Sequence, residues 1–373
     1  GPMDTGPTDT GTPETSPGDT SFADSGAETP PPDTAPKTLK FSKLVRDTAF
    51  DALKIFGGAI EDVGRGCAPS PTSVYVPVRN GGKATVVRWN GTSWIDEGIP
   101  GPPQGAAAVW CTGDDNVWLA ANMSITGSLR RKTGGVWTTP TQPSTGVIGD
   151  ITGFSKTEMF MVGMDDAFSQ TIVWSGDGSS WTELPPLPSS GLFTSVQLYA
   201  PGGGKVVLGG YDVDESAKPK QLGFYVYDGT WTKYLPPTSE KLVLGGAVHG
   251  TSINEIWIAG LTSETVGKVC KVSSLTTWTC WTSASTSPVS VFGPVYTPWS
   301  GAALFAGIRY PIAPGAGRFM TIDSTTVSPA AITIDEKSSG ANAIWRAPGT
   351  NYYFMDHSGK PGEPAGFYRL TSD

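Results

Sequence analysis

Acidic side chains occur in close groups in this chain of 373 residues, and three of these groups have carboxylates that could bind a divalent cation. The groups are Asp114-Asp115, Asp165-Asp166 and the set Asp212, Asp214 and Glu215. Calcium takes about six to eight oxygen ligands from closely spaced loop positions. None of the groups has the spacing of a calcium loop, so exposed turn acids are the favoured interpretation. Asp212, Asp214 and Glu215 are the best candidates for a weak calcium site, and no other cofactor is expected.

Residues for acid–base or nucleophilic catalysis are scarce. The chain has two histidines, His249 and His357, too few for a histidine-rich metal centre. No Gly-x-Ser-x-Gly nucleophile motif and no phosphate-binding glycine loop occur in a strand-to-helix context. The run Gly202–Gly204 lies between two expected strands and is interpreted as a turn. We therefore predict no catalytic residue, and a non-enzyme is favoured over an enzyme.

The charge and the apolar content of the chain limit which classes of binding partner are expected. Lys and Arg total 26 against 34 Asp and Glu, a net charge of −8, and the one local basic cluster is Arg130-Arg131-Lys132. Nucleic-acid binding needs clustered positive charge, so we expect no nucleic-acid partner. No apolar run is long enough to span a bilayer. Membrane contact is expected only through a lipid anchor outside this chain.

The four cysteines are placed as two pairs. Cys270 and Cys280 flank a strand–turn–strand segment and can face each other across a hairpin, which leaves Cys67 and Cys111 as a second pair. Disulfides imply an oxidising compartment, and four reduced, buried thiols are the alternative. The lack of a Cys-x-x-Cys motif disfavours a structural zinc site.

A tryptophan that follows a strand and a short acidic or glycine turn recurs along the chain. Trp94, Trp137, Trp181, Trp231 and Trp278 carry this unit and lie 43, 44, 50 and 47 residues apart. A period of this length indicates small antiparallel sheets that must stack on their neighbours to bury their faces. The predicted fold class is therefore all-β.

Seven apolar strand cores that end in small residues align with this repeat. We interpret them as the inner strands of a seven-bladed β-propeller, with six blades as the alternative. A second strand follows each core, and a preceding strand is visible from the second repeat onward. Either one blade built from both chain ends or two three-stranded blades would close the ring. The cores are Val74–Val78, Val117–Ala121, Met159–Gly163, Val206–Gly210, Ile256–Gly260, Ala303–Gly307 and Tyr352–Asp356.

The segment Ser175-Gly176-Asp177-Gly178-Ser179-Ser180-Trp181 resembles the Asp box of sialidases and related propellers, one residue shorter than the usual motif. With the tryptophan repeat, it makes Ser73 to Asp373 similar to bacterial propellers of the Kelch-like and Asp-box-like kind. The resemblance implies a structural turn and an architecture, not an activity. Ile308-Arg309-Tyr310-Pro311 faintly resembles the arginine motif of sialidases, but it stands in the sixth repeat and no arginine triad is visible.

The first 66 residues differ from the rest. Residues 1–38 are rich in Asp, Thr, Pro, Gly and Ser and are expected to form a disordered tether. This tract resembles the tether of myxobacterial lipoproteins, which implies export and a lipid anchor in the periplasm or on the cell surface. Residues 39–66 are predicted to form an amphipathic helix and linker before a propeller at 67–373, and the helix either packs on the propeller or docks a partner. Its apolar stripe comprises Phe41, Leu44, Val45, Leu53, Phe56 and Ile60.

Long connections after the strand cores are expected to emerge on one face of the propeller. They are Tyr211–Leu222, Leu261–Lys268, Ile308–Gly317 and His357–Gly366. Insertions on one face of a repeat protein mark a recognition surface. The predicted ligand-binding residues on this face are Tyr211, Asp212, Asp214, Glu215, Arg309, Tyr310, Asp356 and His357.

Three functional hypotheses follow. The favoured one is a non-catalytic binding or scaffold protein of the cell envelope that recognises an envelope protein or a surface glycan. The second is a glycan-active hydrolase or lyase, which would need two carboxylates about 5 to 10 Å apart in a pocket at the axis. The third is an accessory subunit that docks on a larger envelope assembly through the N-terminal helix.

Overall fold

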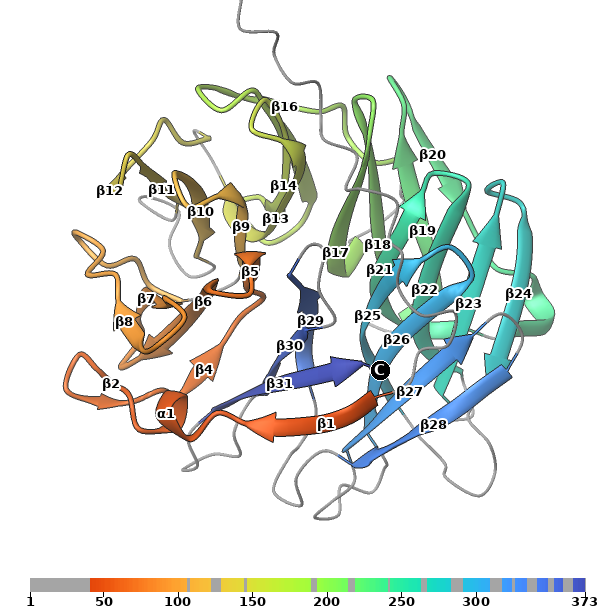
Figure 1. Ribbon diagram of the computed structural model, residues 1–373. Helices are drawn as coiled ribbons and strands as arrows, with labels where there is room; N and C mark the ends of the chain where they lie inside the picture. Colours follow the sequence, from red (N-terminus) through yellow and green to blue (C-terminus); the bar gives the residue numbers. More distant parts are fainter. Residues whose placement is uncertain are drawn as a thin grey trace, which may run out of the picture.

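The protein is built almost entirely from β-strands (Figure 1). The computed structural model describes residues 41–105, 108–121, 129–143, 146–188, 193–213, 219–240, 242–262, 267–282, 291–308, 317–323, 326–333, 341–347, 352–357 and 365–372. The expected tether, residues 1–38, lies outside them. Within the described residues, no helix is long and apolar enough to cross a membrane.

Seven antiparallel sheets of four or five strands follow one another along the described chain. Sheet 1 contains β4 (Asp62–Val63), β5 (Cys67–Ser70), β6 (Ser73–Asn80), β7 (Lys83–Trp89) and β8 (Trp94–Asp96). Sheet 2 contains β9 (Ala108–Gly113), β10 (Asn116–Ala120), β11 (Leu129–Thr133) and β12 (Val136–Thr138). Sheet 3 contains β13 (Val147–Ser155), β14 (Glu158–Met164), β15 (Thr171–Gly176) and β16 (Trp181–Glu183).

The remaining four sheets repeat the same strand order. Sheet 4 contains β17 (Phe193–Gly202), β18 (Lys205–Val213), β19 (Pro219–Tyr227) and β20 (Trp231–Tyr234), and a 3-10 helix η1 (Thr238–Glu240) follows it. Sheet 5 contains β21 (Leu242–Ser252), β22 (Glu255–Thr262), β23 (Gly267–Ser273) and β24 (Thr277–Thr282). Sheet 6 contains β25 (Val291–Trp299), β26 (Ala302–Ile308), β27 (Gly317–Asp323) and β28 (Thr326–Thr333). Sheet 7 contains β29 (Ala341–Arg346), β30 (Tyr352–His357), β31 (Gly366–Ser372) and the N-terminal β1 (Phe41–Arg46).

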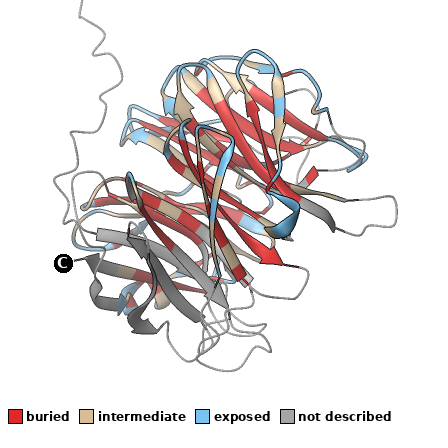
Figure 2. Cartoon of the chain, turned by 90° about the vertical axis from the view of Figure 1, so that its right-hand side faces the viewer, coloured by how far each residue is buried: buried red, intermediate tan, exposed pale blue. Residues whose placement is uncertain are grey.

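The first strands of the sheets surround a common centre (Figure 1). In sheet 1, β4 and β5 both pair with β6, and β5 is counted as the first strand because it contacts β9 of sheet 2. β5, β9, β13, β17, β21, β25 and β29 each contact the next, and β29 contacts β5. The seven predicted inner-strand cores are therefore second strands, and the strands that precede them are the inner ones. The small residues at the end of each core leave room for the adjacent inner strand. A Cβ on Gly163, for example, would collide with the Val147 carbonyl oxygen of β13. In Figure 2, buried positions run along the strands and exposed ones gather at turns.

The antiparallel strand order defines two faces of the molecule. The turns between first and second strands, and between third and fourth strands, open on what we call the turn face. The connections between second and third strands open on the opposite face, together with the links between sheets, and we call it the loop face. The predicted recognition surface corresponds to the loop face.

The predicted amphipathic helix of residues 39–66 is wrong. β1 pairs antiparallel with β31, the helix α1 spans only Thr48–Asp51, and β2 (Lys54–Ile55) and β3 (Gly58–Ala59) form a small hairpin. A helical stripe would place its apolar residues on one buried face, yet Ile60 is buried while Val45 and Phe56 are 40% and 44% exposed. The backbone turns at Phe56 and Gly57, which have φ values of 49° and 82°. The N-terminal segment therefore closes sheet 7, as one of the two closing arrangements predicted from the sequence.

The repeat tryptophans link neighbouring sheets through their indole groups. Three of these indole N–H groups donate to the preceding sheet, in each case to a residue just after that sheet's outer strand. The pairs are Trp94 Nε1 to Asp47 Oδ2 at 3.1 Å, Trp137 Nε1 to Glu97 Oε2 at 3.1 Å and Trp231 Nε1 to the Pro185 carbonyl oxygen at 2.7 Å. Asp47 follows β1, so the N-terminal strand occupies the place that an outer strand takes in the other sheets.

Both predicted disulfides form. Cys67 and Cys111 join the inner strands of sheets 1 and 2, and Cys270 and Cys280 are opposite each other on β23 and β24. Free thiols are absent from the described residues. Two disulfides indicate folding in an oxidising compartment.

Candidate functional site

Two of the predicted ligand-binding residues lie at the loop-face end of β18. Tyr211 and Asp212 are both partly buried, and the β18–β19 connection begins just beyond them. The Asp212 carboxylate forms an ion pair with Lys233 Nζ on β20. Lys233 Nζ also lies 5.5 Å from the centre of the Tyr225 ring. This lysine therefore holds Asp212 against its own sheet.

The structure describes the other predicted ligand-binding residues only in part. Asp356 and His357 are the last residues of β30, which places their backbone at the same face, and their side chains are outside the described set. Asp214, Glu215, Arg309 and Tyr310 lie outside the described residues. Among the residues that the structure does describe, no group of three or more His, Cys, Asp or Glu side chains is placed to hold a metal ion.

An ion pair joins the segment just before β5 of sheet 1 to the inner strand of sheet 3. Arg65 Nη2 lies 2.7 Å from Asp150 Oδ1 and also donates to the Ile151 carbonyl oxygen. Asp150 Oδ2 accepts the Leu198 N–H at 3.1 Å, and its Oδ1 accepts the Ile151 N–H at 2.9 Å. Burial raises the pKa of Asp150, while the Arg65 guanidinium and the two amides act in the opposite direction. Every one of these contacts fixes the carboxylate in place.

His249 lies on the inner strand of sheet 5, between two aromatic rings. The centres of the Tyr199 and Tyr296 rings are 5.2 and 4.6 Å from the imidazole centre. Its Nδ1 is 2.8 Å from Thr297 Oγ1 and accepts the Thr297 N–H at 3.2 Å. Burial lowers the pKa of His249 to about 3, with Arg65 adding to the effect. The imidazole is therefore neutral at physiological pH.

Both inner groups are held by structural contacts. Asp150 is engaged by Arg65 and two backbone amides, and His249, which is partly exposed, lies between two tyrosines and contacts Thr297. A general acid or base must reach a proton of the substrate, and the contacts described for these two groups are with their neighbours in the fold. Among the described residues, both groups contribute to packing of the inner strands.

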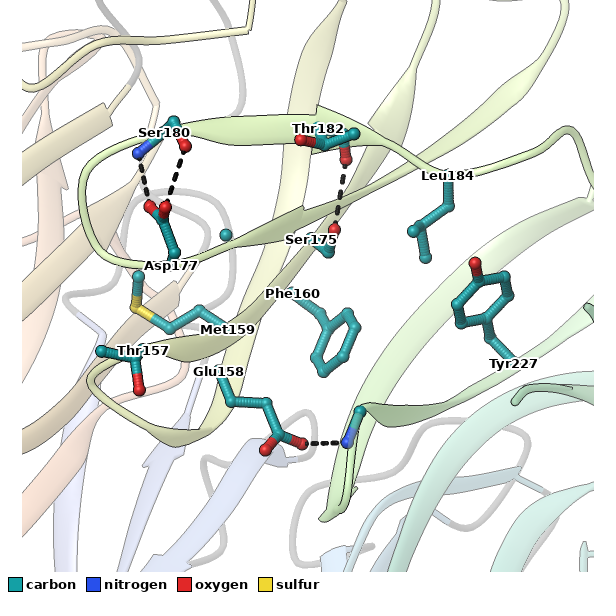
Figure 3. Close-up of a pocket in the computed structure, with 12 residues that line it drawn as sticks. Thr157, Glu158, Met159, Phe160, Ser175, Asp177, Ser180, Thr182, Leu184 and Tyr227 are labelled. Carbon is teal, nitrogen blue, oxygen red and sulfur yellow. Dashed lines mark hydrogen bonds between the residues drawn. The ribbon is translucent and has the colours of Figure 1, made fainter. Parts of the chain in front are cut away.

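A crevice lies on the turn face between sheets 3 and 4 (Figure 3). Its volume is about 340 Å³. Met159 and Phe160 of β14 come from one sheet and Tyr227 of β19 from the next, and Glu158 and Asp177 add carboxylates. The remaining lining residues are Thr157, Ser175, Gly176, Ser180, Thr182, Leu184 and Gly204.

Two turns of this crevice are visible in the sequence, but the crevice itself is not. Asp177, in the Asp-box-like turn, accepts the Ser179 and Ser180 N–H groups at 2.8 and 2.7 Å. Gly204 ends the predicted glycine turn, and its N–H donates to Glu158 Oε1 at 2.8 Å. Asp177 and Gly204 lie 27 positions apart in sequence, which is too far for a local pattern to relate the two turns. The first residues of the second strands carry a pattern that could have pointed to this crevice. There, Glu158-x-Phe160 aligns with Asn116-x-Trp118 and Glu255-x-Trp257.

Comparison with solved structures shows the fold. The structure described as YCF48 bound to D1 peptide superposes with a TM-score of 0.60 at 13% identity, covering 90% of this chain and 100% of that one. The polysaccharide lyase Uly1 superposes with a TM-score of 0.55 at 11% identity, covering 90% of this chain and 100% of that one. No protein-family model matches the sequence, and no curated protein matches it. Both structures are β-propellers, so the chain has a β-propeller fold.

Proposed function

We propose that this protein is a non-catalytic binding or scaffold protein of the cell envelope, which recognises a protein or a glycan on the loop face of its propeller. One observation carries the proposal. Asp150 and His249, the acid–base groups described on the inner strands, are engaged in structural contacts: Arg65 and two backbone amides bind Asp150, and Thr297 contacts His249. The loop face supplies Tyr211, an aromatic side chain that suits recognition by stacking, next to the ion pair of Asp212 and Lys233.

The cellular location belongs to the same proposal. Two disulfides support export. A lipid anchor at the periplasmic or outer surface is proposed from the composition of residues 1–38. The N-terminal docking helix is not part of the proposal, because residues 41–63 form β1, the short α1 and small strands.

The proposal is tested by probing arrays of envelope peptides and surface polysaccharides with the full-length protein. YCF48 was solved with a peptide and Uly1 is a polysaccharide lyase, so both ligand chemistries belong on the arrays. For a ligand found in this way, Tyr211→Ala should weaken binding at least about fivefold, the size expected for an interface aromatic. Lys156→Ala is the matched control, because Lys156 is exposed on the turn face.

Two results would contradict the proposal. One is equal loss of binding in the Tyr211 and Lys156 variants. The other is release of reducing or unsaturated sugar ends from a polysaccharide on the array, since that would show a glycan-active enzyme.

A further inference from the structure

A cation lies opposite an aromatic ring at one repeated position in several sheets. The aromatic residue is the third residue of the second strand, and the cation is its cross-strand partner on the third strand. In sheet 2, Arg131 pairs with Trp118 and lies 4.9 Å from the ring centre. The same pairing joins Tyr75 to Arg88 at 5.9 Å in sheet 1, and Trp257 to Lys271 at 5.8 Å in sheet 5. A cation over a ring at these distances is attracted to its electron-rich face.

Sheet 3 keeps the aromatic residue of this pair and lacks the cation. Phe160 of β14 is paired with Ser175 of β15. Both residues line the crevice between sheets 3 and 4. A serine side chain is much shorter than that of lysine or arginine, so no cationic side chain of this sheet covers the edge of the Phe160 ring at the crevice, where the ring is 3% exposed.

The carboxylate that accompanies the pair in sheet 5 shows what this position binds. Glu255, two residues before Trp257, accepts the Trp257 Nε1–H at 3.2 Å, the Gly301 N–H at 2.6 Å and the Ser300 Oγ–H at 2.5 Å. Its Oε2 is also 3.3 Å from Lys271 Nζ. One glutamate thus receives a glycine amide from the next sheet, an indole, a hydroxyl and an ammonium group.

Glu158 is the corresponding residue of sheet 3, and it retains the glycine contact. Among the described residues, the hydrogen bond that it accepts is from the Gly204 N–H, at 2.8 Å. The indole, hydroxyl and ammonium donors are replaced by Phe160, Gly203 and Ser175. The first two cannot donate from a side chain, and the Ser175 hydroxyl lies 3.5 Å from the Thr182 carbonyl oxygen, to which it donates.

The charge of the crevice favours a cationic occupant. Its twelve lining residues include Glu158 and Asp177 and contain no Lys or Arg. The Ser179 and Ser180 amides and hydroxyls lower the pKa of Asp177, which keeps it anionic. Two basic residues nearby are already engaged: Lys205 Nζ is 2.6 Å from Asp228 Oδ2, and Arg131 donates to the Gly178 carbonyl oxygen. The third, Lys156, is exposed.

We propose that the crevice between sheets 3 and 4 binds an arginine or lysine side chain from an extended segment of a protein partner. The alkyl part would lie on Tyr227 and against the edge of Phe160, and the charged end would meet Glu158 as Lys271 meets Glu255 within sheet 5. The site is on the turn face and is independent of the loop-face function.

The proposal is tested by titrating the full-length protein with N-acetyl-arginine methylamide while recording the ring NMR signals of Tyr227. Tyr227 lines the crevice and is only partly buried there. A saturable shift of the Tyr227 ring signals is expected, and an N-acetyl-glutamate methylamide titration should leave them unchanged. No saturable shift with the arginine probe, or a shift with a neutral methyl glucoside in its place, would overturn the proposal.

Two variants separate this site from a general surface effect. Ser175→Arg restores the internal cation present in sheet 2, so it should fold, occupy the crevice and abolish the Tyr227 shift. Glu158→Gln removes the charge and should weaken binding about fivefold. Glu183→Gln is the charge-matched control on the exposed edge of the same sheet and should leave binding unchanged. Undiminished binding by a folded Ser175→Arg variant would refute the site.

Discussion

Asp47 accepts hydrogen bonds from three separate parts of the chain. Its Oδ1 accepts the Phe50 N–H at 3.0 Å and caps α1, while its Oδ2 accepts Trp94 Nε1–H at 3.1 Å and Arg369 Nη2–H at 2.6 Å. Trp94 belongs to sheet 1 and Arg369 to sheet 7. The carboxylate is nearly fully buried, so its loss would leave a partly buried guanidinium without this partner.

We therefore expect Asp47→Ala to lower the free energy of unfolding by about 2–4 kcal/mol, because buried donors lose their acceptor. Asp47→Asn should cost less, since an amide oxygen can still accept from the Phe50 and Trp94 N–H groups. Asp228→Asn is the control, as the Asp228 carboxylate is 63% exposed and pairs only with Lys205 among the described contacts. Urea unfolding of the three variants measures the effect. Equal stabilities for Asp47→Ala and Asp228→Asn would show that Asp47 does not join the sheets.

At the scale of single elements, the strands were largely predictable and their radial order was not. The apolar cores, the tryptophan turns and the cysteine hairpin all follow from local patterns, and each appears as a strand, a turn or a disulfide. First and second strands are both apolar, so periodicity alone cannot show which lies nearer the axis. Residues 41–63 were misassigned because apolar residues at helical spacing also fit short strands around a turn at Gly57. The contact of Arg65 with Asp150 joins residues 85 positions apart, beyond any local pattern.

The two disulfides join cysteines at different sequence separations, so they should stabilise the folded protein to different extents. Cys67–Cys111 closes a sequence separation of 44 residues between two sheets, whereas Cys270–Cys280 closes 10 within one hairpin. The chain-entropy relation gives about 4 kcal/mol for the first and about 3 kcal/mol for the second. We expect the Cys67→Ala/Cys111→Ala variant to unfold at a lower temperature than Cys270→Ala/Cys280→Ala in calorimetry. The reverse order would mean that the link between sheets 1 and 2 is not limiting for stability.

At the scale of the whole molecule, the ring of sheets is joined by its two chain ends. β1 contributes the outer strand of sheet 7 through pairing with β31, from Phe41 opposite Ser372 to Arg46 opposite Tyr368. It also contacts β28 of sheet 6. A molecule without β1 would expose the edge of β31, and Asp47 would no longer follow the strand that positions it.

Deletion of residues 1–46 should therefore lower the melting temperature by at least about 5 °C, as expected for a loss of a few kcal/mol in a domain of this size. Deletion of residues 1–38 is the matched control, because it removes the expected tether and keeps β1. The shorter deletion should leave the melting temperature unchanged, and limited proteolysis should cut near the C-terminus only in the longer one. If both truncations melt together with the full chain, sheet 7 is stable without its N-terminal strand, and closure by β1 is not what holds the ring of sheets together.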